Sequence, residues 1–115
     1  MTIEELMRAN LLEVFGERDS ARRRAAIERV YTEDVRFSDP DETVVGREAL
    51  GDKAQKILDG APGFVFAPAG PAKVVGDLGH LAWGFGPAGQ AAVVSGVDIA
   101  LVEDGRIAHV YTLLG

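Results

Sequence analysis

The spacing of apolar residues changes near the middle of the chain, and this change constrains the fold more than any other feature. In residues 1–60 the apolar residues recur every three or four positions, as on one face of an α-helix. In residues 61–115 they form shorter runs that Gly and Pro interrupt. Helices followed by a run of strands predict an α+β fold, because an α/β fold needs the two kinds of element to alternate.

Three helices are expected in the first half. Thr2 and Glu5 form a capping box, in which each side chain binds a backbone N–H of the first helical turn. Asp19 or Ser20 suits the N-cap of a second helix, and Gly60 suits the end of a third. The expected helices cover residues 3–15, 21–31 and 47–59.

The second half is expected to form an antiparallel sheet. Asp104-Gly105 is a strong hairpin signal between two apolar runs. The expected strands of this half cover residues 63–67, 72–78, 80–85, 91–103 and 106–114, and one more, residues 35–39, is expected between the second and third helices. Only four of the 18 acidic side chains and two of the 12 basic side chains lie after residue 60. A sheet so poor in charge is expected to be covered on both faces.

The composition narrows the class of protein. At 115 residues, with 47% hydrophobic and 26% charged residues, the chain is expected to fold as a single domain, residues 1–115. The absence of Cys excludes disulfides and thiolate metal sites. A net charge of −6 disfavours a nucleic-acid partner. No membrane span and no signal peptide at residues 1–10 are evident, so we expect a cytoplasmic protein.

The strand at residues 91–103 has no face that suits water. Val97, Ile99 and Leu101 make one face large and apolar, whereas small residues leave room on the other. Asp98 points into that room, where a carboxyl group must find a partner or stay protonated. A strand covered on both faces predicts helices on one side and a second layer or partner chain on the other.

Four motifs in the chain resemble those of a known family. They read Y-x-x-D-V-x-F-x-D-P (residues 31–40), V-G-R-E-A-L (45–50), W-G-F-G-P (83–87) and G-V-D-I-A-L-V-E-D-G-R-I (96–107). These motifs are similar to those of SnoaL-like proteins in the NTF2-like superfamily, which also contains ketosteroid isomerases and polyketide cyclases. The resemblance implies a cone-shaped, cystatin-like α+β roll. In it, about three N-terminal helices pack on a curved antiparallel sheet around an apolar pocket.

The resemblance also implies chemistry and partners. Asp39 falls where ketosteroid isomerases have their proton-transfer base, and Asp98 falls where they have a neutral carboxyl group that donates a hydrogen bond to the enolate oxygen. The tyrosine of that set is expected near Leu11, and the first helix has none. We hypothesise that the chain is an isomerase or cyclase of small apolar carbonyl compounds and that it uses no cofactor. We further expect it to form a homodimer through the outer sheet face, residues 97, 99 and 101.

A non-catalytic interpretation fits both acids as well. Asp39 before Pro40 suits a turn, in which the carboxylate accepts backbone N–H groups. Asp98 suits a structural hydrogen bond to Tyr31, Trp83 or a helix terminus. The chain is then a ligand-binding or dimeric protein of the same fold, or a protein-interaction module that uses the outer sheet face.

Nine residues complete the expected pocket wall: Leu11, Phe15, Tyr31, Phe37, Leu50, Trp83, Gly96, Ala100 and His109. His109 shares a strand face with Ile107 and Tyr111, so that face lines either the pocket or an interface. We interpret His80 as a solvated residue at a turn. The three arginines at 22–24 are interpreted as a solvated helix surface, and no metal site is expected.

Overall fold

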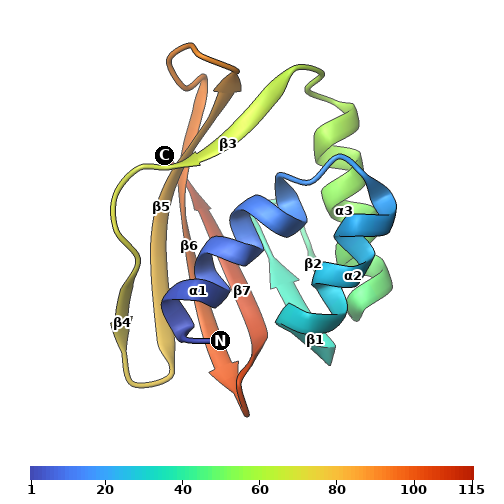
Figure 1. The fold of residues 1–115 in the computed structure, drawn as a ribbon, viewed down its shortest axis with the longest axis vertical. Helices are drawn as coiled ribbons and strands as arrows, with labels where there is room; N and C mark the ends of the chain where they lie inside the picture. The colour runs from blue at the N-terminus through green and yellow to red at the C-terminus, as the bar shows by residue number, and fades with distance from the viewer.

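Three helical segments lie against one seven-stranded sheet in the computed structural model, which describes residues 1–115 (Figure 1). This architecture confirms the α+β prediction. In chain order the elements are α1 (Ile3–Ala9), the π-helical turn η1 (Asn10–Phe15), α2 (Ser20–Val30), β1 (Tyr31–Ser38), β2 (Thr43–Val45), α3 (Arg47–Asp59), β3 (Phe64–Pro68), β4 (Lys73–Val75), β5 (Leu78–Pro87), β6 (Val94–Glu103) and β7 (Arg106–Leu114).

The first helix begins as predicted but changes its geometry halfway. The backbone N–H of Glu5 donates to the Thr2 hydroxyl at 3.1 Å, and that of Thr2 donates to the Glu5 carboxylate at 2.8 Å. From Asn10 onward the helix is π-helical, which widens each turn. Asn10 and Leu11 of this segment are both buried, at 0% and 1% exposed, as are Leu6 and Met7 of the α-helical part.

The strands of the second half pair antiparallel as predicted, but the sheet as a whole is mixed, because β1 of the first half runs parallel to β7. Its strand order is β2-β1-β7-β6-β5-β3, and β4 pairs with one end of β5. All neighbouring pairs are antiparallel except β1 and β7, which run parallel. A parallel pair needs a long connection, and here β2, α3 and the strands β3 to β6 lie between the two. Local patterns do not show which distant strands pair.

Some element boundaries also differ from the prediction. Tyr31 begins β1 instead of ending α2, β4 covers only Lys73–Val75, and β6 begins at Val94. Leu78 and Pro87 both belong to β5, so His80 lies within a strand and not at a turn.

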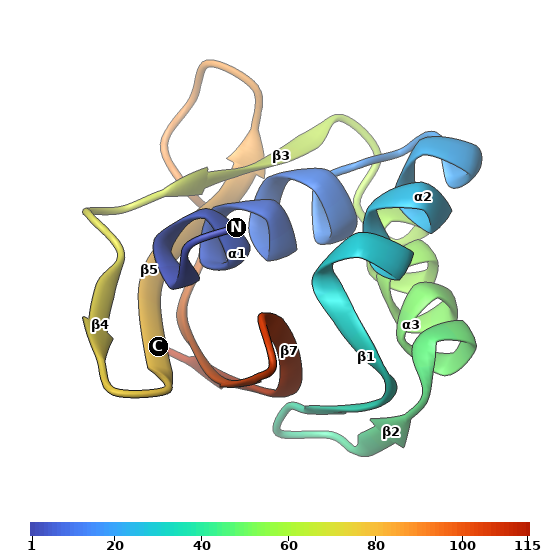
Figure 2. The ribbon, with the colours of Figure 1, turned by 60° about the horizontal axis from the view of Figure 1, so that its bottom comes forward.

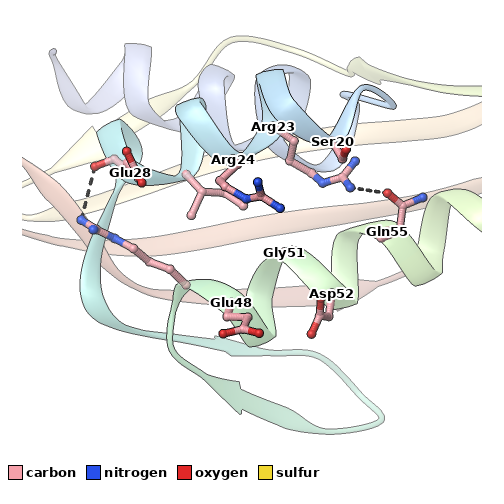
Figure 3. A pocket seen from close by; sticks show the side chains of 10 residues that line it. Ser20, Arg23, Arg24, Glu28, Glu48, Gly51, Asp52 and Gln55 are labelled. Atoms are coloured by element: carbon pink, nitrogen blue, oxygen red, sulfur yellow. Dashed lines mark hydrogen bonds between the residues drawn. The ribbon is translucent and has the colours of Figure 1, made fainter.

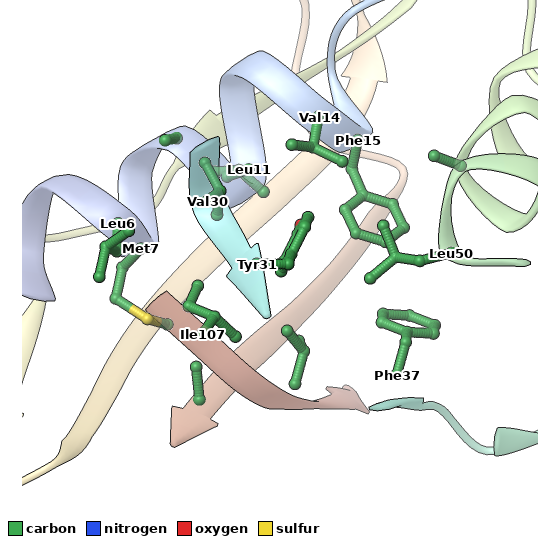
Figure 4. Packing of buried hydrophobic residues seen from close by; sticks show 14 of the residues in the cluster. Leu6, Met7, Leu11, Val14, Phe15, Val30, Tyr31, Phe37, Leu50 and Ile107 are labelled. Carbon is green, nitrogen blue, oxygen red and sulfur yellow. The ribbon is translucent and has the colours of Figure 1, made fainter. Parts of the chain in front are cut away.

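The core lies between the helices and the concave face of the curved sheet, which wraps around α1 (Figure 2). Figure 4 shows Met7 of the first helix extending toward Ile107 of β7, with Leu11 beside Val30. The first helix can pack closely on β5 because Gly79 has no side chain, since a Cβ atom there would lie 2.6 Å from the Met7 sulfur. At the far end of the helix, Phe15 packs on Phe37 with ring centroids 5.0 Å apart.

A β-bulge changes the faces of β7. His109 pairs with Leu101, but Ile107 pairs with Val102, so Ala108 is an extra residue between them. Ile107 is therefore buried in the core, whereas His109 points to the outer face beside Tyr111. The expectation that Ile107, His109 and Tyr111 share one face is wrong for this reason.

Candidate active site

A cavity of about 270 Å³ lies between the first helix, α3 and the inner face of the sheet. Its wall is mostly apolar and brings both sequence-predicted acids, Asp39 and Asp98, to one space. The exposed lining residues Pro40, Val94 and Leu114 mark its mouth. The lining residues are Leu11, Phe15, Phe37, Asp39, Pro40, Asp41, Lys53, Ile57, Phe66, Trp83, Phe85, Val94, Asp98, Thr112 and Leu114.

Aromatic side chains form much of this wall. Phe66 of β3 stacks on Phe85 of β5 with ring centroids 4.0 Å apart and meets Trp83 edge to face at 5.3 Å. The strand pairing of β3 with β5 fixes these contacts, because Phe66 lies directly opposite Phe85. The rings offer a flat, apolar surface to a ligand.

Asp98 is the buried polar group of the cavity. It lies in the middle of β6 and is 5% exposed. Three neutral donors reach it: Trp83 Nε1 at 3.0 Å and Thr112 Oγ1 at 2.7 Å bind Oδ1, and Asn10 Nδ2 at 3.1 Å binds Oδ2. No Lys, Arg or His lies within ion-pair distance. A buried carboxyl group without a cation is uncommon outside functional sites.

Burial raises the pKa of Asp98 to about 6, against the lowering effect of the hydrogen bonds from Thr112, Trp83 and Asn10. With this pKa the group is mostly ionised at pH 7 and half protonated near pH 6. A carboxyl group in this range exchanges protons readily in either direction at neutral pH.

The raised pKa predicts that Asp98 destabilises the fold as it ionises. Between pH 3.8 and about 6, Asp98 is protonated in the folded chain but ionised in the unfolded chain. The protonated carboxyl group therefore contributes its full stabilisation below pH 3.8, and this stabilisation is lost as the pH rises through 6. Urea unfolding of the wild type and Asp98→Asn, from pH 3.5 to 7.5, should show the wild type losing about 3 kcal/mol relative to the variant. A difference that does not vary with pH would contradict this expectation.

Asn10, which was not among the predicted site residues, connects Asp98 to the interior. The Tyr31 hydroxyl donates to Asn10 Oδ1 at 2.5 Å, and the amide of Asn10 donates to Asp98. Asn10 lies three and four positions after Met7 and Leu6, which are core residues. A polar residue at a position where a helix is apolar was the available signal.

Asp39 lies at the mouth of the cavity in an ion pair that the sequence analysis also missed. Lys53 Nζ of α3 lies 2.8 Å from Asp39 Oδ2 and 2.9 Å from Glu42 Oε2. The other oxygen of Asp39 accepts the backbone N–H groups of Asp41 and Glu42, as the turn interpretation expected. Burial raises the pKa of Asp39, but hydrogen bonds from Lys53 and these N–H groups outweigh it and hold the pKa below its usual value.

Lys53→Met is expected to raise the pKa of Asp39, because the variant removes the strongest of the interactions that favour its ionised form. A carboxyl-carbon NMR titration of Asp39 measures the change. Lys73→Met, on the distant strand β4, is the control and should leave the titration unchanged. An unchanged Asp39 pKa in Lys53→Met would mean that the turn N–H groups alone hold it low.

Five residues expected in the pocket wall lie elsewhere. Tyr31 and Leu50 are fully buried in the core, as is Ala100. Gly96 lies behind the Trp83 ring, where a Cβ atom would lie 2.5 Å from Cζ2. His109 is on the outer face because of the bulge, with Nε2 3.0 Å from the Ser38 hydroxyl.

A larger groove of about 530 Å³ lies between α2 and α3 (Figure 3). Its lining is polar and charged, with Arg24 and Glu48 exposed to solvent. Arg23 is an exception to the predicted solvated surface, because it is buried and donates to the Glu17 carbonyl oxygen and to Gln55. We assign the site to the smaller cavity, since apolar walls with a few convergent polar groups are typical of ligand sites.

No group of three or more metal-ligating side chains converges anywhere in the structure. No helix is long and apolar enough to cross a bilayer. The fold and the site together define a small α+β protein with an apolar cavity around a buried carboxyl group. Residues 9–110 match the model of the SnoaL-like domain family, and the chain belongs to that family.

Solved structures with this fold are numerous. A candidate isomerase of the SnoaL-like family from Agrobacterium tumefaciens is 24% identical and superposes with a TM-score of 0.91, covering 100% of this chain and 99% of that one. A candidate ketosteroid isomerase from Kribbella flavida is 19% identical, with a TM-score of 0.75 and coverage of 98% and 77%. A candidate SnoaL-like polyketide cyclase from Jannaschia is 19% identical, with a TM-score of 0.74 and coverage of 99% and 88%.

Other structural neighbours are described as NTF2-like and cystatin-like, which confirms the predicted fold. At these identities the likeness shows the fold alone. No curated protein matches the chain significantly in sequence.

Proposed function

We propose that the chain is an enzyme that moves a proton on a small, neutral carbonyl compound, as an isomerase or a cyclase. The observation that carries this proposal is the Asp98 carboxyl group, which lies in an apolar cavity without a cation and has a pKa of about 6. The candidate isomerases and cyclase with the same fold agree with it.

We assign to Asp98 the role of proton-transfer base that the sequence suggested for Asp39. A base works best when its pKa lies near the working pH, which favours Asp98 over Asp39. In an isomerisation, the Asp98 carboxylate takes a proton from the carbon next to the carbonyl group, and the C–H electron pair moves into an enolate. Protonated Asp98 then returns the same proton to a more distant carbon, which shifts the double bond.

Lys53 is the candidate for the group that stabilises the enolate oxygen. An ammonium group has three N–H donors, and Asp39 and Glu42 take two, which leaves one for a ligand oxygen. Asp39 then acts as a positioning residue that holds Lys53 at the cavity mouth. Its low pKa suits this role, because the carboxylate must stay ionised to hold the lysine.

The cavity also limits the ligand. At about 270 Å³ it is smaller than sites for drug-sized ligands, so one or two rings are the expected size. Its wall has three carboxyl groups, Asp39, Asp41 and Asp98, against the single cation Lys53. This charge disfavours carboxylic acids and favours neutral ketones.

The proposal is tested with 2-tetralone, an apolar two-ring ketone, in D₂O. We expect the protein to accelerate deuterium incorporation next to the carbonyl group, measured by NMR. Asp98→Asn should slow this exchange severely and Asp39→Asn should weaken it less. Exchange that needs Asp39 but not Asp98 would instead support Asp39 as the proton-transfer base. Tight binding of ketones, enones or epoxides without exchange or turnover would favour a ligand-binding protein, an outcome consistent with the three donors that already satisfy Asp98.

We further propose a homodimer through the outer sheet face. Leu101, Tyr111 and Leu113 on this face are 39–56% exposed, and Val97 and Ile99 lie between them. Sedimentation equilibrium should give twice the chain mass of 12.2 kDa, and Ile99→Lys should give the monomer. A monomeric wild type would leave this face to a different protein partner.

A further inference from the structure

A chain of buried hydrogen bonds connects Asp98 to Tyr31, which lies in the core and does not line the cavity. Tyr31, at the start of β1, is 0% exposed, and its hydroxyl makes one hydrogen bond, to Asn10 Oδ1. Asn10 is also 0% exposed and makes its other side-chain bond to Asp98 Oδ2. Three buried groups from β1, η1 and β6 thus form a single chain of hydrogen bonds that ends at the cavity.

An asparagine amide has two ends with opposite character. Its oxygen accepts hydrogen bonds and its NH₂ group donates them, so a half-turn of the amide reverses what it presents to Asp98. In the observed orientation the NH₂ group faces Asp98 and favours the ionised carboxylate. In the reversed orientation the amide oxygen would face Asp98. It would favour the protonated form of Asp98, because only that form has an O–H group to donate to the oxygen.

The hydroxyl of Tyr31 distinguishes between these two orientations. If the amide reversed, its NH₂ group would face the tyrosine oxygen, and the hydroxyl proton would lose its acceptor. A buried donor without an acceptor is unfavourable, so the observed orientation is preferred. A bond from the hydroxyl to Oδ1 also strengthens the amide as a donor toward Asp98.

We propose that Tyr31 is a positioning residue, whose hydroxyl holds the Asn10 amide with its donor end toward Asp98. This inference rests on the proposed function only for its catalytic consequence, because the hydrogen bonds themselves are independent of turnover. The titratable groups that face Asp98 are Tyr31 from the core and Asp39, Asp41 and Lys53 across the cavity. Of these groups, only Tyr31 forms a side-chain hydrogen bond with Asn10.

The test is a carboxyl-carbon NMR titration of Asp98 without any ligand. Tyr31→Phe keeps the ring and is expected to raise the Asp98 pKa by about half a unit to one unit, and Asn10→Leu by about one to two units. Combining both changes should give the same pKa as Asn10→Leu alone, since Tyr31 acts through Asn10. Tyr111→Phe, on the outer face, is the matched control and should change nothing.

Two outcomes would overturn the inference: an unchanged pKa in Tyr31→Phe while Asn10→Leu raises it, or two shifts that add. Should a variant fail to fold, the side-chain NH₂ signals of Asn10 in the wild type provide a second measurement. They should titrate with the pKa of Asp98, and signals that do not respond would also overturn the inference. If the pKa shifts appear but no ketone shows exchange, the proposed function fails and the positioning role stands.

Discussion

Asp98→Asn is expected to lower the proposed deuterium exchange into 2-tetralone by roughly 10²–10⁴-fold, the usual contribution of a general acid or base. The amide has no proton to give up or accept near neutral pH. The asparagine amide has nearly the same shape as the carboxyl group, so its oxygen can still accept the hydrogen bonds from Trp83 and Thr112. NMR measures the exchange rate, and chemical-shift mapping of bound 2-tetralone shows whether the cavity still binds it.

The wild-type rate should also rise with pH around 6, as Asp98 becomes the carboxylate that takes the proton. Asp104→Asn, in the exposed turn between β6 and β7, is the matched control and should keep both the rate and its pH profile. Asp98→Asn that retains the wild-type rate would remove Asp98 from the reaction. Loss of rate together with loss of binding would point to a damaged cavity instead.

Gly96→Ala is expected to destabilise the protein by about 1–3 kcal/mol, although the change adds only one methyl group. The added Cβ atom would lie 2.5 Å from Trp83 Cζ2 and 2.6 Å from the Leu113 carbonyl oxygen, both in strands paired with β6. The backbone oxygen cannot move without breaking the sheet, so the Trp83 ring must shift. Urea unfolding at pH 7 measures the loss of stability.

The same shift should weaken the bond from Trp83 Nε1 to Asp98 and so raise the Asp98 pKa. Ser95→Ala is the matched control, because Ser95 is the exposed neighbour of Gly96 and its side chain makes no hydrogen bond. We expect little change in stability or pKa there. If Gly96→Ala is as stable as the wild type, the strand pair yields more easily than the geometry indicates.

The fold was largely predictable because its signals are local. Helix caps, a period of three to four residues and an Asp-Gly turn act within a few residues of each other, and each is found in the structure. The pairing of β1 with β7 was not predictable in this way. Their contact depends on the path of the whole chain between Ser38 and Arg106.

Asn10 and Lys53 illustrate what the sequence analysis lacked. Each lies on the apolar stripe of a helix, Asn10 beside Leu6 and Lys53 beside Leu50, and each binds one of the two predicted acids. The stripe alone marks such a residue as unusual. It does not say which carboxyl group the residue meets, because the partners are 88 and 14 positions away in the chain.

The sequence by itself determined the α+β class and marked Asp39 and Asp98 as the acids to examine. Only the tertiary structure decided the chemical character of each, because a pKa depends on the groups that surround a carboxyl in space. Lys53 and two backbone N–H groups hold Asp39 ionised at the mouth, while burial raises the pKa of Asp98 inside. Periodicity fixes on which face of an element a side chain lies, but long-range packing fixes what it meets there.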